Sequence, residues 1–172
     1  MINYDEHINK NANTLLSLPT KGALCDQIIK FSTFPRVIFC TMGKSAYACR
    51  KVVYTARSYG LNWHDLDVCH AFHGDAGLIK EGDLLVYVSK SGETRETIEV
   101  AKTFSEWESI AICSDPGSSL VCCARDKIII PIEEEASPFG FAPMISTAMY
   151  LIVLHAIFKI FLLLRSTSIF SY

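Results

Sequence analysis

Short apolar runs alternate with longer segments of helical periodicity along most of the chain. The runs are RVIFC (36–40), LLVYV (84–88), SIAIC (109–113) and KIIIP (127–131), with a weaker one at WHDL (63–66). Apolar runs of this length, bounded by polar or turn residues, predict buried β-strands. We therefore expect five strands.

Amphipathic segments between these runs predict helices. One apolar face combines Cys49, Val52, Val53, Ala56 and Tyr59 before Gly60, a second combines Thr94, Ile98, Ala101 and Phe104, and residues 117–124 form a short helix. The N-terminal segment, about 1–33, also has helical periodicity. Strands that alternate with helices predict a parallel sheet covered on both faces. We expect one α/β domain over 1–172, with its α/β core at about 34–165.

The last apolar segment, MYLIVLHAIFKIFLLL (149–164), requires a comparison with membrane spans. His155 and Lys159 interrupt it, and it is shorter than the roughly 20 residues that cross a bilayer. This predicts a core or subunit-interface helix and no membrane partner.

Composition narrows the class of protein. Half of the 172 residues are hydrophobic, which excludes a disordered chain. A net charge of −2 with scattered lysines and arginines gives no nucleic-acid-binding surface. The seven cysteines include no C-x-x-C pair, which favours buried reduced thiols over zinc ligands or disulfides. No secretion signal is evident at the N-terminus, so we expect a cytoplasmic protein.

Candidate ligand loops follow the strands, because open parallel sheets bind ligands at the carboxyl ends of their strands. SKSGET (89–94) combines three hydroxyls, Lys90 and Gly92 just before a helix, where free N–H groups and the helix dipole favour an anion. Capping explains only one or two of these hydroxyls, so this loop predicts a phosphate site. TMGKSA (41–46) is compatible with a helix capped by Ser45 and with a ligand loop.

Two further loops carry titratable side chains. In EEEASPFGFAP (133–143), Glu133 and Glu134 are typical of a solvated surface, whereas Glu135 precedes an apolar, proline-bounded segment. Apolar surroundings raise the pKa of a carboxylate and suit it to act as a general base, which we expect of Glu135. HAFHGDAGLI (70–79) is compatible with a metal or proton-transfer site, and equally with a structured loop capped by Asp75.

Taken together, these loops resemble the sugar isomerase (SIS) domain. SKSGET is similar to the superfamily's phosphate-binding signature, serine-x-serine-glycine-x-threonine. MGKSAYACRKVVYTARSYG, HAFHGDAGLIKEGDLLVYVSKSGETRET and EEEASPFGFAPMISTAMYL resemble the SIS domain of D-arabinose-5-phosphate isomerases. That family has the forms G-x-G-K-S-G, H-G-D-L-G, S-x-S-G-E-x-x-E and E-A-C-P-x-x-L-A-P-T-S-S-T. The resemblance covers roughly residues 20–165.

The resemblance implies a fold and a reaction. The fold is a three-layer α/β/α sandwich around a five-stranded parallel sheet, of the Rossmann/flavodoxin-like kind. The reaction interconverts D-ribulose 5-phosphate and D-arabinose 5-phosphate through a cis-enediol, the first step toward the octulosonate sugar (Kdo) of lipopolysaccharide. The family needs no cofactor and forms homodimers or homotetramers.

Matching positions imply a phosphate-binding set. Ser45, Ser89, Ser91 and Thr94 correspond to residues that hold the phosphate. Lys90 stands where relatives carry a small polar residue, and its charge would strengthen anion binding.

Matching positions also imply a catalytic set. Lys44 corresponds to the family's loop lysine, suited to stabilising the enediolate oxygen. Glu96 and Glu135 correspond to its two active-site glutamates, and Glu135 is expected to shuttle the proton. His73 corresponds to the histidine of H-G-D-L-G, which lines the site and can take an inhibitory metal ion in relatives; no metal is required.

The chain departs from the family at several places. Thr41 replaces a glycine, and Ala46 and Tyr47 replace a glycine-histidine pair. The sequence ends before the family's later S-H-P-G-G-A-L-G histidine and without the paired CBS domains of many relatives, so we expect an SIS-only form. The leading hypothesis is the isomerase. The alternatives are a non-catalytic sugar-phosphate-binding module, acting as a sensor or regulator, and an isomerase of another sugar phosphate.

Overall fold

The computed structural model describes residues 9, 12–13 and 25–169. Its strands are β1 (Val37–Thr41), β2 (Trp63–Asp67), β3 (Leu84–Val88), β4 (Ser109–Cys113) and β5 (Asp126–Ile129). Its helices are α2 (Cys25–Thr33), α3 (Gly43–Ser58), α4 (Val68–Ala71), η1 (Asp75–Leu78), α5 (Arg95–Thr103), α6 (Ser119–Cys123), η2 (Pro138–Gly140) and α7 (Ile145–Ile169).

The strands form a parallel sheet in the order β2-β1-β3-β4-β5. Val37 of β1 lies between Trp63 of β2 and Leu84 of β3. The order reverses after β1, because the chain first moves outward to β2 and then returns to place β3 on the other side of β1. Such a reversal opens a crevice at the carboxyl ends of the two central strands, β1 and β3.

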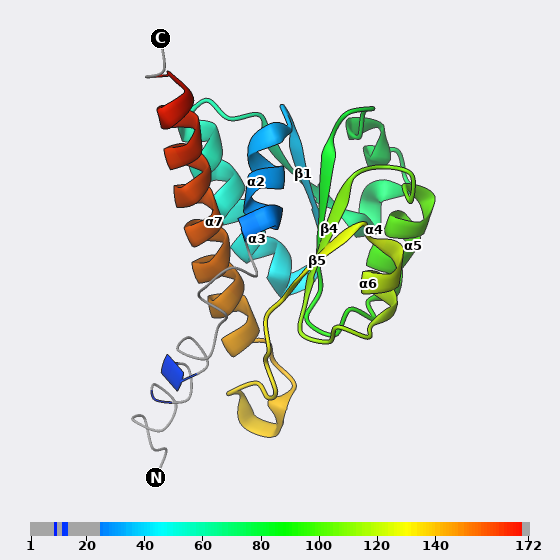
Figure 1. Cartoon of the computed structure of the whole chain (residues 1–172). Helices are drawn as coiled ribbons and strands as arrows, with labels where there is room; N and C mark the ends of the chain where they lie inside the picture. The colour runs from blue at the N-terminus through cyan, green and yellow to red at the C-terminus, as the bar shows by residue number, and fades with distance from the viewer. Residues whose placement is uncertain (1–8, 10–11, 14–24, 170–172) are drawn as a thin grey trace.

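Helices cover both faces of the sheet, as Figure 1 shows, with α2, α3 and α7 on one side and α4, α5 and α6 on the other. β1, β3 and β4 are buried along their whole length, which explains why they read as continuous apolar runs. The predicted α/β/α sandwich around five parallel strands is therefore confirmed for the described residues.

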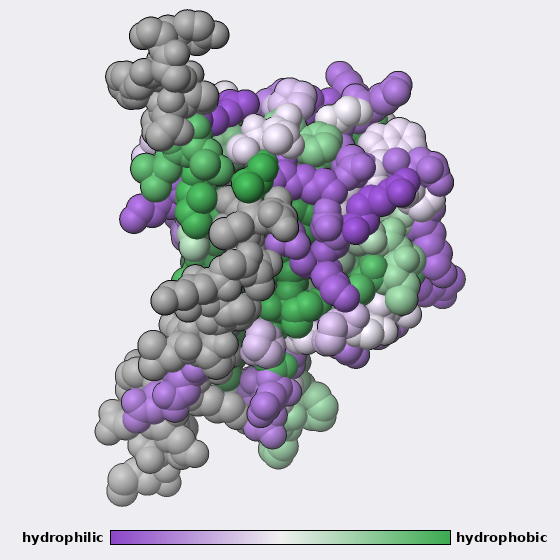
Figure 2. Space-filling view, in the orientation of Figure 1, coloured by the Kyte–Doolittle hydropathy of each residue, from purple (hydrophilic) through white to green (hydrophobic). Residues whose placement is uncertain are grey.

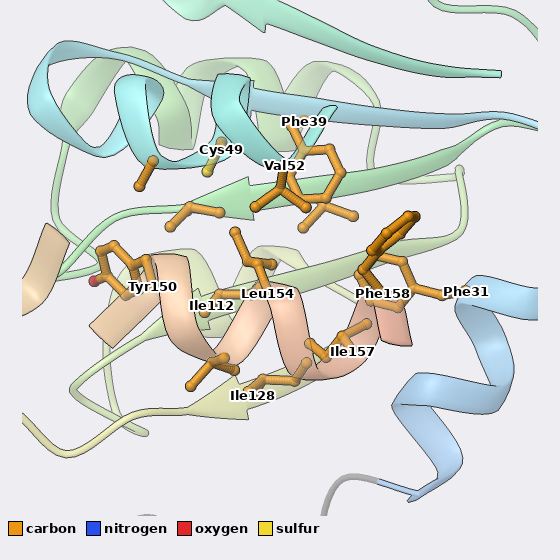
Figure 3. Close-up of a cluster of buried hydrophobic side chains, with 14 of the residues drawn as sticks. Phe31, Phe39, Cys49, Val52, Ile112, Ile128, Tyr150, Leu154, Ile157 and Phe158 are labelled. Atoms are coloured by element: carbon orange, nitrogen blue, oxygen red, sulfur yellow. The ribbon is translucent and has the colours of Figure 1, made fainter. Parts of the chain in front are cut away.

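The larger of the two cores lies between the sheet and α7. Figure 3 shows Phe39 of β1 and Ile112 of β4 facing Tyr150, Leu154 and Phe158 of α7, with α3 and α2 closing the sides. All these side chains are almost fully buried. Helix α7 thus holds one face of the sandwich together.

Helix α7 is longer than the sequence indicated. It extends over Ile145–Ile169, and the stretch Ile145–Arg165 is long and apolar enough to cross a membrane by length and composition. The expectation that this segment is too short to cross a bilayer is therefore wrong. Its buried stripe, which includes Met149, Val153 and Ile157, packs on the sheet as a core helix does. Figure 2 shows hydrophobic atoms over the upper part of α7.

Two smaller expectations are also wrong. Asp75 does not cap η1, whose N-cap is Gly74; the capping carboxylate in this region is Asp67, which accepts the N–H of Cys69 at 3.0 Å. Cys69 and Cys122 are exposed instead of buried, although both are free thiols like the other described cysteines. The N-terminal helix is described only over α2, and the rest of that prediction lies outside the described residues.

Candidate functional site

A pocket of about 280 Å³ lies at the carboxyl ends of β1 and β3, where the strand order reverses. It receives residues from the loops after β1, β3 and β5, and from the start of α7. Its polar side chains are Ser45, Ser89, Lys90, Ser91, Thr94, Glu135 and Ser146. Six of these seven were predicted from the sequence as site residues, and the fold brings them to one place.

The hydroxyl loop, residues 89–94, forms one wall of this pocket. Ser89 Oγ accepts the N–H of Gly92 at 3.2 Å and lies 2.8 Å from Thr94 Oγ1, and Ser91 Oγ accepts the N–H of Glu93 at 3.1 Å. Thr94 is the N-cap residue of α5, but its side chain makes no capping hydrogen bond. The hydroxyls therefore shape the loop itself, and they do not close the helix end.

Backbone contacts fix this loop to its neighbours. Lys90 C=O accepts the N–H of Ser114 at 2.9 Å, and Gly92 C=O accepts the N–H of Leu120 at 3.0 Å. Gly92 has φ +68°, and a Cβ at this position would lie only 2.1 Å from Ser118 Oγ. Glycine is required here for both reasons, the left-handed backbone and the contact with Ser118 at the start of α6. The loop is a preformed cradle.

Glu135 forms the opposite wall. Its side chain is only 3% exposed, and Oε2 accepts the N–H groups of Met144 at 2.7 Å, Ile145 at 2.8 Å and Ser146 at 3.3 Å. These are N–H groups at the start of α7, which have no partner inside the helix. The chain between β5 and α7 therefore folds back so that Glu135 closes the helix N-terminus.

This contact reverses the electrostatic prediction for Glu135. Burial alone would raise the pKa of its carboxyl group. The nearby Ser146 side chain and the N–H groups of Met144 and Ser146, together with the charge of Lys90, outweigh burial and lower the pKa below its ordinary value. The expectation of a raised pKa in the free protein is wrong, because it considered the apolar neighbours and not the helix start.

Two buried polar atoms in the pocket have no hydrogen-bond partner among the described residues. They are Glu135 Oε1 and Ser146 Oγ. Buried polar atoms are nearly always hydrogen-bonded, so unpaired ones in a pocket wall indicate contact with a ligand or water. The nearest cation to Glu135 Oε1 is Lys90 Nζ, at 3.6 Å, whose side chain is one-third exposed.

Three helices begin at the pocket, and they differ in how their N-termini are occupied. The carboxylate of Glu135 accepts the free N–H groups at the start of α7. The N-cap residues of α3 and α5, Met42 and Thr94, make no side-chain capping bond. The positive ends of α3 and α5 thus remain available to an anion on the side of the hydroxyl loop. The pocket therefore has one half whose donors suit an anion such as phosphate, the phosphate half, and one half that carries the carboxylate of Glu135, the carboxylate half.

Ser45 is the third residue of α3 and not its cap, so the capping alternative for TMGKSA is wrong and the side chain lines the pocket. Three predicted residues do not line it. Lys44 and Glu96 are exposed on the first turns of α3 and α5, and His73 is exposed after α4. Among the described residues, no group of three or more histidine, cysteine, aspartate or glutamate side chains is arranged to hold a metal ion.

Sequence reasoning did not single out several of the residues that line the pocket, among them Ser146 and Phe141. Ser146 lies in the quoted stretch EEEASPFGFAPMISTAMYL, and a serine in the first turn of a helix at the site was a usable signal. Phe141 lines the pocket although it is 87% exposed, and its neighbour Phe139 is 89% exposed at φ +63°. The loop with this aromatic pair projects beside the N-terminal end of α7 (Figure 1).

Comparisons with known proteins identify the family to which this fold is similar. The model of the SIS domain family matches residues 30–160. Arabinose 5-phosphate isomerase KpsF of Escherichia coli O6:H1 is 34% identical over 115 residues, which cover 66% of this chain and 35% of the relative. Arabinose 5-phosphate isomerase KdsD of Yersinia pestis is 30% identical over 131 residues, which cover 75% of this chain and 39% of the relative.

A solved structure extends the similarity. An E. coli CFT073 protein in complex with arabinose 5-phosphate has a TM-score of 0.86 and 25% identity, over 96% of this chain and 94% of that one. The chain spans less than two-fifths of the length of the two curated isomerases. With the family model matched across the sheet and both helical layers, the chain belongs to the SIS domain family.

Proposed function

We propose that the protein is an aldose–ketose isomerase that interconverts D-ribulose 5-phosphate and D-arabinose 5-phosphate. The similarity to curated arabinose 5-phosphate isomerases and to a protein solved with arabinose 5-phosphate supports this sugar phosphate. Because the chain covers only part of those isomerases, the reaction of the whole protein is inferred from the site.

The observation that carries the proposal is the polarity of the pocket. One half offers hydroxyls and two uncapped helix starts, which suit a phosphate, and the other half offers the unpaired Oε1 of Glu135. A sugar phosphate held by its phosphate at the hydroxyl loop would extend its carbonyl end toward Glu135. This is the orientation that proton transfer next to a carbonyl requires.

The chemistry then needs one base and a stabilised oxyanion. Glu135 Oε1 removes the proton on the carbon next to the carbonyl; the electron pair forms the carbon–carbon double bond, and the carbonyl π electrons move to its oxygen to give a cis-enediolate. A proton then passes from the neighbouring hydroxyl to this oxygen. The carboxyl group returns its proton to the former carbonyl carbon as the other oxygen becomes the new carbonyl, so no net proton is consumed. The charge on the enediolate oxygen requires a cation or hydrogen-bond donor nearby. Lys44 and Glu96 keep their proposed supporting roles, from exposed positions on the first turns of α3 and α5.

One observation favours a second candidate function, a sugar-phosphate-binding module without catalysis. The pocket wall contains Glu135 but neither Lys44 nor Glu96. The residues proposed to hold the phosphate therefore lie together, whereas two of the three proposed catalytic residues lie outside the pocket wall. Such a module would bind the sugar phosphate and report its concentration. An isomerase of another sugar phosphate would use the same pocket with different hydroxyl contacts.

The test is an assay of the purified chain with D-arabinose 5-phosphate, detecting ribulose 5-phosphate. We expect turnover in the wild-type chain and roughly a thousandfold less in Glu135→Gln, with thermal stabilisation by the sugar phosphate in both. Stabilisation without turnover in the wild-type chain would instead identify the binding module. A panel of aldose phosphates of different length, assayed in parallel, would identify a different substrate.

We also propose that the protein acts as a cytoplasmic homodimer or homotetramer, with 1–172 forming one SIS domain. The exposed apolar residues Ile152 and Ile160 on α7 support an interface, because one helix face is already packed on the sheet. Light scattering of the purified chain measures the oligomeric state directly.

A further inference from the structure

Lys90 connects the two halves of the pocket. Its backbone belongs to the hydroxyl loop, between Ser89 and Ser91, while its ammonium group lies 3.6 Å from Glu135 Oε1 on the opposite wall. It also lines the adjoining cavity of about 480 Å³ that Glu133 and Glu134 border. It is the one lysine or arginine among the described residues that line the pocket.

The contact between Lys90 and Glu135 is loose. At 3.6 Å it is longer than a hydrogen bond, and the lysine side chain is 33% exposed while the glutamate is 3% exposed. A lysine side chain has a flexible four-carbon stem and a compact charge, so it can turn toward a new partner without moving the backbone. The backbone itself is fixed by the N–H of Ser114.

A bound phosphate would compete for this cation. A dianion seated on the hydroxyl loop carries more charge than one carboxylate, and it would lie against the loop that bears Lys90. Glu135 would keep its three N–H partners on Oε2, so it would remain in place when Lys90 leaves.

We propose that Lys90 is a positioning residue that pairs with Glu135 in the empty site and turns to the phosphate of a bound sugar phosphate, which frees Glu135 Oε1 to accept a proton. The catalytic benefit of this movement rests on the proposed isomerase function, whereas the movement of Lys90 itself does not. It makes the basicity of Glu135 depend on whether the phosphate half is occupied.

The other groups around Glu135 do not replace Lys90 in this role. Glu133 and Glu134 border the adjoining cavity and carry no cationic group, and burial raises the pKa of Tyr150 of α7, which keeps its phenol neutral. The N–H groups of α7 are fixed to Oε2. Lys90 is therefore the cation whose movement would change the charge at Oε1.

The first test needs no turnover. Calorimetry measures the binding of sulfate, a dianion that does not titrate, at about pH 5, near the ordinary pKa of glutamate. Titrations in two buffers of different ionisation enthalpy give the number of protons taken up on binding. We expect the wild-type chain to take up a fraction of a proton for each sulfate bound. Lys90→Gln should take up less than half of that fraction, and Glu135→Gln none. Lys102→Gln, which removes an exposed lysine on α5, should behave as the wild type.

The charge-conserving variant Lys90→Arg tests whether proton uptake depends on the positive charge at this position or on the lysine side chain as a structural element. Lys90→Arg should restore proton uptake and unfold as the wild type does, and Lys90→Gln should unfold only slightly earlier, because it loses one partly exposed ion pair. Equal proton uptake in wild type and Lys90→Gln would overturn the proposal, as would an absence of sulfate binding by the wild-type chain.

The second test uses the pH dependence of turnover. In Lys90→Gln, the acid limb of kcat/KM, which reports the free protein, should move up by about half a pH unit, while the acid limb of kcat should stay in place. KM should rise about tenfold from the lost phosphate contact. A shift of both limbs would show that Lys90 stays beside Glu135 in the loaded site. If no turnover occurs in any variant, the isomerase proposal fails while calorimetry still decides the role of Lys90.

Discussion

The two halves of the pocket differ in what their polar groups already bind. In the hydroxyl loop, Ser89, Ser91 and Thr94 are joined to each other and to backbone N–H groups, so the loop has its shape before any ligand arrives. On the opposite wall, Glu135 has one oxygen satisfied by α7 and the other left without a hydrogen bond. On the proposed function, the first half holds the phosphate, and the second keeps one carboxylate oxygen free to accept a proton.

The largest expected effect comes from removing the negative charge of Glu135. Glu135→Gln should lower turnover by roughly a thousandfold, the scale of a lost general base, and change sulfate affinity by less than about twofold. Stability should fall by about 1 kcal/mol, because one amide oxygen still caps α7. Steady-state kinetics, calorimetry and urea unfolding measure the three quantities. A loss of sulfate binding with turnover retained would show that the two halves are assigned the wrong way round.

A substitution at Gly92 should disrupt the preformed hydroxyl loop. Gly92→Ala forces a side chain into the space of Ser118 at a left-handed backbone position, and we expect a destabilisation of at least about 3 kcal/mol and a loss of sulfate affinity of about a hundredfold. Gly60→Ala is the matched control. Gly60 has φ +74° and open space around it, so it isolates backbone strain of about 1–2 kcal/mol. Equal effects at both glycines would contradict the contact with Ser118.

Two serines, one in each half of the pocket, test whether the two halves have different roles. Ser89→Ala removes a hydroxyl that accepts the N–H of Gly92, so stability should fall by about 1 kcal/mol and sulfate affinity by about tenfold. Ser146→Ala removes an unpaired hydroxyl, so stability should change by less than about 0.5 kcal/mol. Its main effect should appear as weaker binding of the sugar phosphate, by about fivefold, with sulfate affinity unchanged. Calorimetry with both ligands separates the two outcomes.

The smallest expected effect is on the pH dependence of stability. The pKa of Glu135 is lowered in the folded protein, so its ionised form stabilises the fold above the ordinary glutamate pKa near 4.5. That contribution is lost as the pH falls through the folded-state pKa. Urea unfolding of Glu135→Gln should therefore depend less on pH below about 4.5 than unfolding of the wild type. Parallel pH profiles would show that Glu135 is not charged where it caps α7.

The sequence predicted the sheet well because buried parallel strands carry their signal locally. Leu84–Val88 and Ser109–Cys113 are continuous apolar runs, and each has the bounds predicted from its pattern. The hydroxyl loop was predictable for the same reason, since its serines, threonine and glycine are close together in the chain. The start of α7 was placed four residues too late, because Ile145 and the residues after it include polar side chains that interrupt the apolar pattern.

Glu135 shows what local reasoning could not reach. Its environment is set by N–H groups nine to eleven residues later, which approach only because the loop after β5 folds back. No pattern in EEEASPFGFAP shows that approach. The proximity of Lys90 to Glu135 is of the same kind, since 45 positions of sequence separate residues that lie 3.6 Å apart.

The double attachment of Glu135 has a consequence for how related sequences are compared. One oxygen maintains the start of the longest described helix, and the other faces the pocket. A descendant that abandoned catalysis would still be selected to retain this carboxylate, because losing it would weaken the fold. Retention of a glutamate at this position therefore reflects the architecture of α7, and enzymes and sensors on this scaffold must be told apart by other residues.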